Sequence, residues 1–116
     1  ESRGLNLGGA LAARLGAGFV MARIPGRLPA ETIEETYAKE YGTDCIQIHK
    51  DAIDENDVVL LHDDLLATGG TMAAAYRLVQ KCGAKKSLIN FVIELDGLNG
   101  RNAFPKDVEI ETLLKL

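Results

Sequence analysis

The sequence predicts an α/β fold with a parallel, Rossmann-like sheet, in one domain that comprises residues 1–116. Apolar runs at 57–62, 86–93 and 108–114 have the length and composition of strands, the last of them an edge strand. A helical pattern over 72–82 lies between the first two runs, and strand, loop, helix and strand in this order are typical of parallel α/β sheets. The 47% apolar and 26% charged residues are a normal globular composition.

The N-terminal half is expected to add a helix, two strands and a flexible loop. Apolar residues recur at three- and four-residue steps over 5–15, which indicates a short helix that ends at glycines. The apolar run 18–23 predicts a buried strand, and the proline-containing stretch 23–32 predicts turns. Residues 31–43 are polar and acidic, so we expect a mobile loop there. The alternating residues 45–49 predict a half-exposed strand, which could form a hairpin arm with the strand before it.

Charge, hydropathy and cysteine usage exclude several classes of partner. The net charge of −4 provides no basic field that would attract nucleic acid. No apolar run approaches the roughly 18 residues that span a membrane, and no signal segment opens the chain. Cys45 and Cys82 form no CxxC pair and have no histidine at metal-ligand spacing. We therefore expect reduced thiols in a cytoplasmic protein that binds neither nucleic acid nor membrane.

The most informative stretch is 58–71, VVLLHDDLLATGGT. A buried strand is expected to end in Asp63 and Asp64, at the carboxyl edge of the sheet, where open α/β sheets bind ligands. The two glycines that follow allow close backbone approach to a ligand, and a helix start offers free N–H groups to an anion. Thr68 and Thr71 add hydroxyl donors. Acceptors for ribose hydroxyls next to donors for a phosphate predict a sugar phosphate site.

Other interpretations of this stretch remain open on the residues alone. Thr71 could be only the N-cap of the helix, the glycines could only close a turn, and the acids could be solvated. A Walker loop is disfavoured because no lysine follows the glycines. An unrelated receiver-like α/β domain could use an acid pair to bind Mg²⁺, but it would not need the TGGT sequence.

The same stretch resembles the phosphoribosyl pyrophosphate signature of type I phosphoribosyltransferases, and LLATGGT is the form found in their adenine-specific branch. ESRG at 1–4, RIPGRLPAET at 23–32 and EYGTDCIQIHKDAI at 40–53 resemble the same branch in the same order. The resemblance implies a type I phosphoribosyltransferase core with a flexible hairpin loop. It also implies an enzyme of purine salvage that requires Mg²⁺ and transfers the phosphoribosyl group from phosphoribosyl pyrophosphate to adenine, giving AMP and pyrophosphate.

The resemblance further implies which residues bind the ribose 5-phosphate part of the substrate. Asp63 and Asp64 would face the ribose hydroxyls, directly or through a water bound to the metal. The residues that would hold the 5′-phosphate are Ala67, Thr68, Gly69, Gly70 and Thr71.

Other residues are assigned by the same resemblance to the leaving group and to proton transfer. Arg3 and Arg23 would approach the pyrophosphate, which the planar guanidinium group suits well. Arg27 stands where the family usually has lysine, so the charge is kept. Glu40 matches the catalytic glutamate and would handle the proton on the purine ring, with Tyr41 beside it. Closure of the loop would exclude water from the reacting centre.

Three departures from the family pattern accompany the resemblance. Ile24 replaces a frequent lysine, which puts one pyrophosphate contact in doubt. His62 stands where an aliphatic residue is usual, either as a buried, hydrogen-bonded histidine or as a group that tunes Asp63. A further N-terminal portion, with a strand and the hood that binds adenine, precedes ESRG in the family. Without it we expect an unpaired sheet edge and poor solubility of these residues alone.

The alternatives within this resemblance are a phosphoribosyltransferase for another base and a non-catalytic, purine-sensing regulator with the same fold. Regulators of that kind carry a DNA-binding domain and lose the catalytic loop, whereas this sequence keeps Glu40. Base choice depends largely on the hood, so family likeness alone favours adenine. The resemblance also implies a homodimer.

Overall fold

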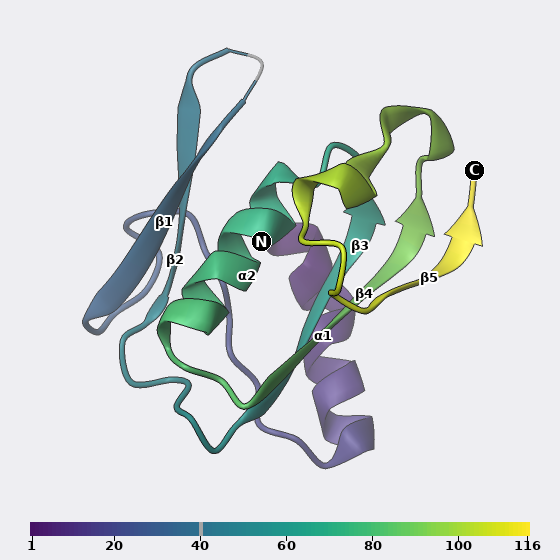
Figure 1. Cartoon of the computed structure of the whole chain (residues 1–116). Helices are drawn as coiled ribbons and strands as arrows, with labels where there is room; N and C mark the ends of the chain where they lie inside the picture. The colour runs from purple at the N-terminus through teal and green to yellow at the C-terminus, as the bar shows by residue number, and fades with distance from the viewer. Residues whose placement is uncertain (40) are drawn as a thin grey trace.

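The computed structural model of the chain describes residues 1–39 and 41–116. The elements are α1 (Ser2–Leu15), β1 (Thr32–Ala38), β2 (Thr43–His49), β3 (Val58–Leu66), α2 (Gly70–Lys81), β4 (Lys86–Glu94) and β5 (Ile110–Lys115), with 3-10 turns at Asp96–Leu98 and Gly100–Ala103. Figure 1 shows α2 between the β1–β2 hairpin and the sheet of β3, β4 and β5, with α1 behind β3. None of the helices described is long and apolar enough to cross a membrane.

The sheet is parallel, as the order of elements in the sequence predicted. β3 pairs with β4 and β4 pairs with β5, with Val58 opposite Lys86 and Ile89 opposite Ile110. All three strands end at the upper edge of Figure 1, where α2 begins and the turns after β4 lie. This is the edge at which open α/β sheets bind ligands.

Helix α2 is apolar on two sides, and this lets it join the sheet to the hairpin. On one side Met72, Ala75 and Val79 belong to the cluster of buried side chains that includes β3 and β4. On the other side Ala74 and Leu78, both 0% exposed, pack with Ile46 and Ile48 of β2. A two-stranded hairpin is marginal by itself in water, so its stability here comes from this packing.

The prediction of a mobile loop over 31–43 was wrong for its first half. Residues 32–38 form β1, which pairs antiparallel with β2 along its whole length, from Thr32 opposite His49 to Ala38 opposite Thr43. Ile33 and Tyr37 pack against the buried cluster that α2 forms with Ile46 and Ile48 of β2. Glu35, whose side chain is only 17% exposed, forms ion pairs with Arg77 and Lys81 of that helix. Packing and charge pairing from outside the segment thus convert a polar sequence into a strand.

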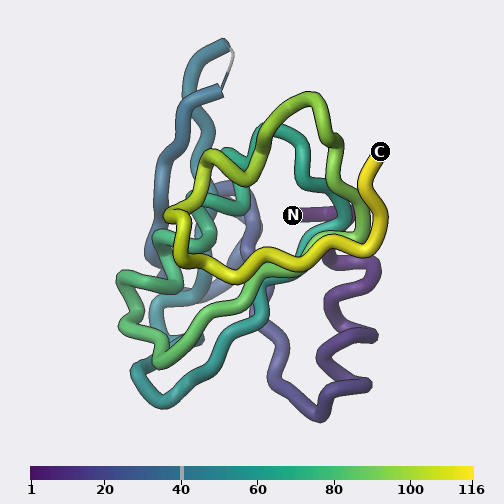
Figure 2. Tube along the Cα trace, turned by 45° about the vertical axis from the view of Figure 1, so that its right-hand side comes forward, coloured from purple at the N-terminus to yellow at the C-terminus, as the bar shows by residue number. Residues whose placement is uncertain are grey.

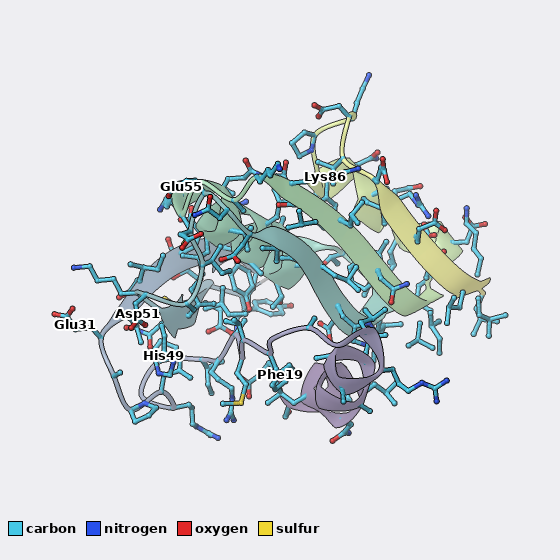
Figure 3. All side chains as sticks on the ribbon, turned by 90° about the horizontal axis from the view of Figure 1, so that it is seen from below. Phe19, Glu31, His49, Asp51, Glu55 and Lys86 are labelled. Atoms are coloured by element: carbon cyan, nitrogen blue, oxygen red, sulfur yellow. The ribbon has the colours of Figure 1, made fainter. Side chains whose placement is uncertain are left out.

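The strand predicted over 18–23 is also not formed, so β1 is the hairpin partner of β2. Only Arg23 pairs with β2, as an isolated bridge in which its N–H donates to the Gln47 carbonyl at 2.9 Å. Figure 2 follows this segment from the end of α1 to the hairpin. Phe19 lies beside α1 (Figure 3), close to Gly8, although its side chain is still 47% exposed.

Helix α1 begins at Ser2, earlier than the position 5 expected, and ends at Leu15, where Gly16 stops it as predicted. The remaining boundaries agree within a few residues. β3 runs on to Leu66, however, so Asp63 and Asp64 lie within the strand and not after it.

Candidate functional site

The loop that joins β3 to α2 contains Ala67, Thr68, Gly69, Gly70 and Thr71, here called the phosphate loop. Gly69 is the N-cap of α2 with a φ of 87°, a left-handed conformation that favours glycine. The alternative in which Thr71 is the N-cap is therefore wrong, and no side chain caps this helix. A helix start with uncapped N–H groups is a natural site for an anion.

Thr71 lies in the first turn of α2, and its side chain links the phosphate loop to the hairpin. The Thr71 hydroxyl donates to the hydroxyl oxygen of Tyr37 at 3.0 Å. The ring of Tyr37 also lies close to Gly70, since a Cβ atom there would be 3.4 Å from Cδ2. Tyr37 is a site residue that was not predicted from the sequence, although its alternation with Ile33 and Glu35 follows the two-residue period of a strand.

The acid pair lies in β3, just before the phosphate loop in the sequence, and contacts the first turn of α1. Asp63 is close to Gly4, where a Cβ atom would be 2.5 Å from the Asp63 carboxylate, and its Oδ1 accepts the N–H of Asp64 at 2.9 Å. Burial raises the pKa of Asp63 above its usual range. Asp64 pairs with Arg3, whose Nε is 3.4 Å from Oδ2. The structure thus brings Arg3 to the acid pair.

Arg23 is held by a residue that the sequence analysis did not single out. Its Nε and Nη2 donate to the two carboxylate oxygens of Glu1 at 3.0 and 3.2 Å. Glu1 also accepts the N–H of Ile24 at 3.0 Å, and its hydrogen bonds with Arg23 lower its pKa. The only sequence signal for this role is the place of Glu1 in ESRG. Arg23 therefore lies near the start of α1 with its guanidinium group engaged.

The other predicted residues lie farther from this centre or outside the described part. Arg27 is exposed in the connection before β1, next to Gly26. Tyr41 is 86% exposed at the tip of the hairpin. Glu40 lies outside the described residues. The structure thus brings Arg3 to the acid pair, and Asp63 and Thr71 line one groove, whereas no hydrogen bond or ion pair of Arg27 or Tyr41 with these groups is found among the described residues.

His62 is hydrogen-bonded, as the first of its two interpretations expected, but its side chain is only half-buried. It lies opposite Asn90 in the register of β3 and β4, and its Nδ1 is 2.8 Å from Oδ1 of Asn90. The Nε2 atom is buried without a hydrogen-bond partner among the described residues. The hydrogen bond of His62 is thus to Asn90 and not to Asp63.

The described residues contain no group of three or more His, Cys, Asp or Glu side chains that could enclose a metal ion. Asp63 and Asp64 are two neighbouring carboxylates, which could coordinate a metal ion from one side but could not enclose it. Magnesium retains several waters and commonly binds through one or two carboxylates together with substrate phosphates, so this donor set fits a partly hydrated Mg²⁺. Cys45 and Cys82 are free thiols, as expected.

An apolar groove of about 420 Å³ extends from the acid pair between α1, the segment 17–20 and β3. Its walls include Leu11, Phe19 and Leu60, and Asp63 and Thr71 also line it. The β3 edge beside the groove has no strand partner among the described residues. This agrees with the expected unpaired edge of the sheet.

Comparison with known proteins assigns the family. A phosphoribosyl transferase domain model matches residues 1–107. An adenine phosphoribosyltransferase of Phocaeicola vulgatus is 81% identical over 116 residues, which are 100% of this chain and 67% of that protein. The chain thus spans about two thirds of the length of that curated relative.

Solved structures agree with this assignment. The adenine phosphoribosyltransferase of Rhodothermus marinus is 52% identical with a TM-score of 0.96, and the alignment covers 100% of this chain and 66% of that one. The Trypanosoma brucei enzyme, solved in complex with AMP, pyrophosphate and ribose-5-phosphate, is 32% identical with a TM-score of 0.90 over 99% of this chain and 53% of that one. The family match, the relative and the shared fold together show that the chain belongs to the adenine phosphoribosyltransferases, transferases that act on adenine and phosphoribosyl pyrophosphate in purine salvage.

Proposed function

We propose that residues 1–116 form a single domain that binds phosphoribosyl pyrophosphate and transfers its phosphoribosyl group to adenine, with AMP and pyrophosphate as products. The observation that carries the proposal is the position of the phosphate loop next to the acid pair, at the carboxyl edge of the parallel sheet. A 5′-phosphate on the loop would leave the ribose hydroxyls within reach of carboxylates. The Trypanosoma brucei relative binds ligands of these chemical types.

In this proposal the phosphate loop binds the 5′-phosphate through backbone N–H groups and the hydroxyls of Thr68 and Thr71. The positive end of the α2 dipole adds to this binding. Asp63 and Asp64 accept hydrogen bonds from the ribose hydroxyls. Burial of Asp63 makes these interactions stronger than they would be in water, because the local dielectric constant is lower.

The cations around the first helix neutralise the leaving pyrophosphate. Arg3 already lies at the acid pair, and Arg23 lies at the start of the same helix through its pairing with Glu1. Arg27 would join them from the exposed connection. Transition states that develop charge are stabilised by fixed donors of this kind.

We propose that Glu40, which lies outside the described residues, and Tyr41 serve proton transfer, as the family resemblance implies. Glu40 would exchange the proton on the purine ring, and Tyr41 would pack beside the substrate once the hairpin covers it. The 86% exposure of Tyr41 leaves this side chain available for such a contact. Exclusion of water by the hairpin would protect the reacting carbon from hydrolysis.

We further propose that Asp63 and Asp64 hold Mg²⁺, mainly through its water ligands. When bound, the metal supplies positive charge to the departing pyrophosphate. The intact protein is proposed to be a cytoplasmic homodimer, as the family resemblance implies.

The test is incubation of the intact protein with radiolabelled adenine, phosphoribosyl pyrophosphate and Mg²⁺, with hypoxanthine and guanine in parallel reactions. We expect AMP from adenine and no nucleotide from the other two bases. Omission of Mg²⁺, or the Asp63→Asn/Asp64→Asn double variant, should abolish the product. Equal rates with hypoxanthine or guanine would refute the assignment to adenine.

A further inference from the structure

We infer that Arg101 is a positioning residue for the phosphate loop. It holds in place the backbone of residues 95–104, here called the supporting segment, which contacts the phosphate loop. This inference rests on the proposed function of the phosphate loop. It is carried by the contact between the two segments and by the way in which Arg101 anchors one of them.

The two segments touch backbone to backbone, with no space between them. A Cβ atom at Gly69 would lie 2.5 Å from the carbonyl oxygen of Gly100 and 3.0 Å from Cβ of Ala103. A Cβ atom at Gly100 would overlap the carbonyl oxygen of Ala67 and lie 2.7 Å from Cδ1 of Leu66. Any displacement of Gly100 would therefore be transmitted directly to the backbone of the phosphate loop.

The supporting segment has little regular structure of its own. It consists of two short 3-10 turns joined at Asn99, which has a left-handed φ of 53°. Its first residues are tied to the sheet, because the N–H of Leu95 donates to Leu66 at 3.0 Å and that of Asp96 to Leu116 at 2.8 Å. At the other end, Phe104 is buried in the core. The turn that contacts Gly69 lies between these anchors.

Arg101 attaches that turn to the sheet. Its Nε and Nη2 donate to the two carboxylate oxygens of Glu94 at 2.9 and 3.0 Å, and Nη1 donates to the Ile110 carbonyl at 3.1 Å. Glu94, only 5% exposed, also accepts the hydroxyl of Thr112 at 3.0 Å. One side chain thus joins the supporting segment to both β4 and β5, with a bidentate geometry that sets orientation as well as distance.

The role of Arg101 is indirect. Its three side-chain hydrogen bonds among the described residues are to Glu94 and Ile110, so its charge is committed to the sheet and not presented to a ligand. The N–H groups of the phosphate loop must be placed within about 0.5 Å to bind a phosphate well. Loss of the Arg101 anchor should therefore weaken binding of the 5′-phosphate and leave adenine binding unchanged.

The experiment compares Arg101→Gln with Arg77→Gln in the intact protein. Arg77 is a matched control because its side chain is also 45% exposed and also pairs through Nε with a glutamate, Glu35, at 3.0 Å. Its pair, however, anchors the hairpin and not the supporting segment. The measurements are KM for phosphoribosyl pyrophosphate and for adenine, Kd for AMP, and the melting temperature.

For Arg101→Gln we expect KM for phosphoribosyl pyrophosphate and Kd for AMP to rise about tenfold, with KM for adenine changed less than twofold. Arg101→Lys should restore part of the affinity, because lysine keeps the charge but loses the bidentate geometry. In Arg77→Gln, Kd for AMP should stay within twofold of the original protein. A fall in melting temperature with unchanged affinity for both phosphate ligands would show a merely structural role and overturn the inference.

A second variant, Gly100→Ala, tests the contact itself and decides the matter if Arg101→Gln does not fold. The added methyl group would push on Ala67 while the Arg101 anchor stays intact, so the same selective loss of phosphate affinity is expected. Unchanged Kd for AMP in folded Gly100→Ala would overturn the inference. Absence of AMP formation by the original protein would instead refute the proposed function.

Discussion

The phosphate loop and the β1–β2 hairpin meet at the first turn of α2, and they are held there by different means. The loop is fixed by backbone contacts: two glycines, a left-handed cap and the carbonyl oxygen of Gly100. The hairpin is fixed by side chains, namely the apolar residues of β2 on Leu78 and the ion pairs of Glu35. Among the described residues, the only hydrogen bond that joins the two regions is the one between the hydroxyls of Tyr37 and Thr71.

The contrast between the two regions indicates which kind of structure a short sequence motif can encode. A loop fixed by its own backbone tolerates almost no change in composition, so its sequence is distinctive. A hairpin fixed by distant side chains depends on the surface against which it packs. The following variants test whether the two modes of attachment are as separate as the structure indicates.

The largest effect is expected for Gly69→Ala, which disrupts the backbone contact between the phosphate loop and Gly100. Left-handed strain of about 1–2 kcal/mol and overlap with Gly100 of about 1–3 kcal/mol should together reduce the free energy of unfolding by about 4 kcal/mol. Affinity for phosphoribosyl pyrophosphate should be lost. The control is Gly83→Ala, with a φ of 77° but no atom within 4 Å of the added Cβ, which should cost only about 1 kcal/mol. Equal costs, measured by denaturant unfolding, would contradict the close approach of the two loops.

The next largest effect is expected for Leu78→Ala, which removes part of the apolar packing between α2 and the hairpin. Leu78 is 0% exposed, so its truncation should reduce the free energy of unfolding by about 3 kcal/mol. Hydrogen exchange should show loss of protection in β1 and β2 before β4. The control is Leu113→Ala, at 75% exposure, with an expected change below about 0.5 kcal/mol. Simultaneous loss of protection in all strands would mean that the hairpin is not a separate unit.

A smaller effect is expected for Tyr37→Phe, which removes the hydrogen bond to Thr71 and keeps the ring. The free energy of unfolding should fall by about 1 kcal/mol. Tyr76→Phe is the control, because this tyrosine packs against the sheet cluster and no side-chain hydrogen bond of it is found among the described residues. If both variants change the melting temperature by the same amount, the hydrogen bond between hairpin and loop does not contribute to stability.

The smallest effect on stability is expected for Glu34→Gln, a variant that should nevertheless change the reactivity of Cys45 in β2. Its thiol lies 2.7 Å from a carboxylate oxygen of Glu34, and this hydrogen bond raises its pKa to about 11. Because the neutral thiol is favoured in the folded state, the reactive thiolate appears only as the pH rises toward that value. Alkylation at pH 8.5 should therefore be slow, and Glu34→Gln should accelerate it about tenfold or more.

Cys82 provides the internal reference for that measurement, because burial alone raises its pKa. Its alkylation rate, followed by peptide mass spectrometry, should be the same with and without Glu34→Gln. Acceleration at both cysteines would indicate a looser fold and not a local hydrogen bond.

The parallel core and the phosphate loop could be predicted from the sequence because their signals are local. Each of these elements is indicated by its own residues. β3 and β4 are marked by apolar runs, α2 by the spacing of its apolar residues, and the loop by its glycines. The helix cap was the exception within this region, since Thr71 has the residue type of a cap while Gly69 has the conformation. The hydroxyl of Thr71 bonds to Tyr37, a residue 34 positions away.

The N-terminal half was predicted less well because its signals are not local. Glu35 is an acid in an acidic stretch, and only Arg77 and Lys81, more than 40 positions later, make a strand favourable there. Phe19, Val20 and Met21 form an apolar run, yet each is more than a third exposed and the described residues offer them no neighbouring strand. The pairing of Glu1 with Arg23 likewise joins residues that no spacing rule connects.

The position of α2 between sheet and hairpin also sets an order of events during synthesis. The hairpin is complete at His49, whereas the helix that covers it ends at Lys81, which is 81 − 49 = 32 residues later. At roughly 5–20 residues per second, a nascent chain would carry Ile46 and Ile48 without their partners for several seconds. Over that interval the two isoleucine side chains are exposed apolar surface, which favours aggregation, and this exposure ends when the last turns of α2 emerge.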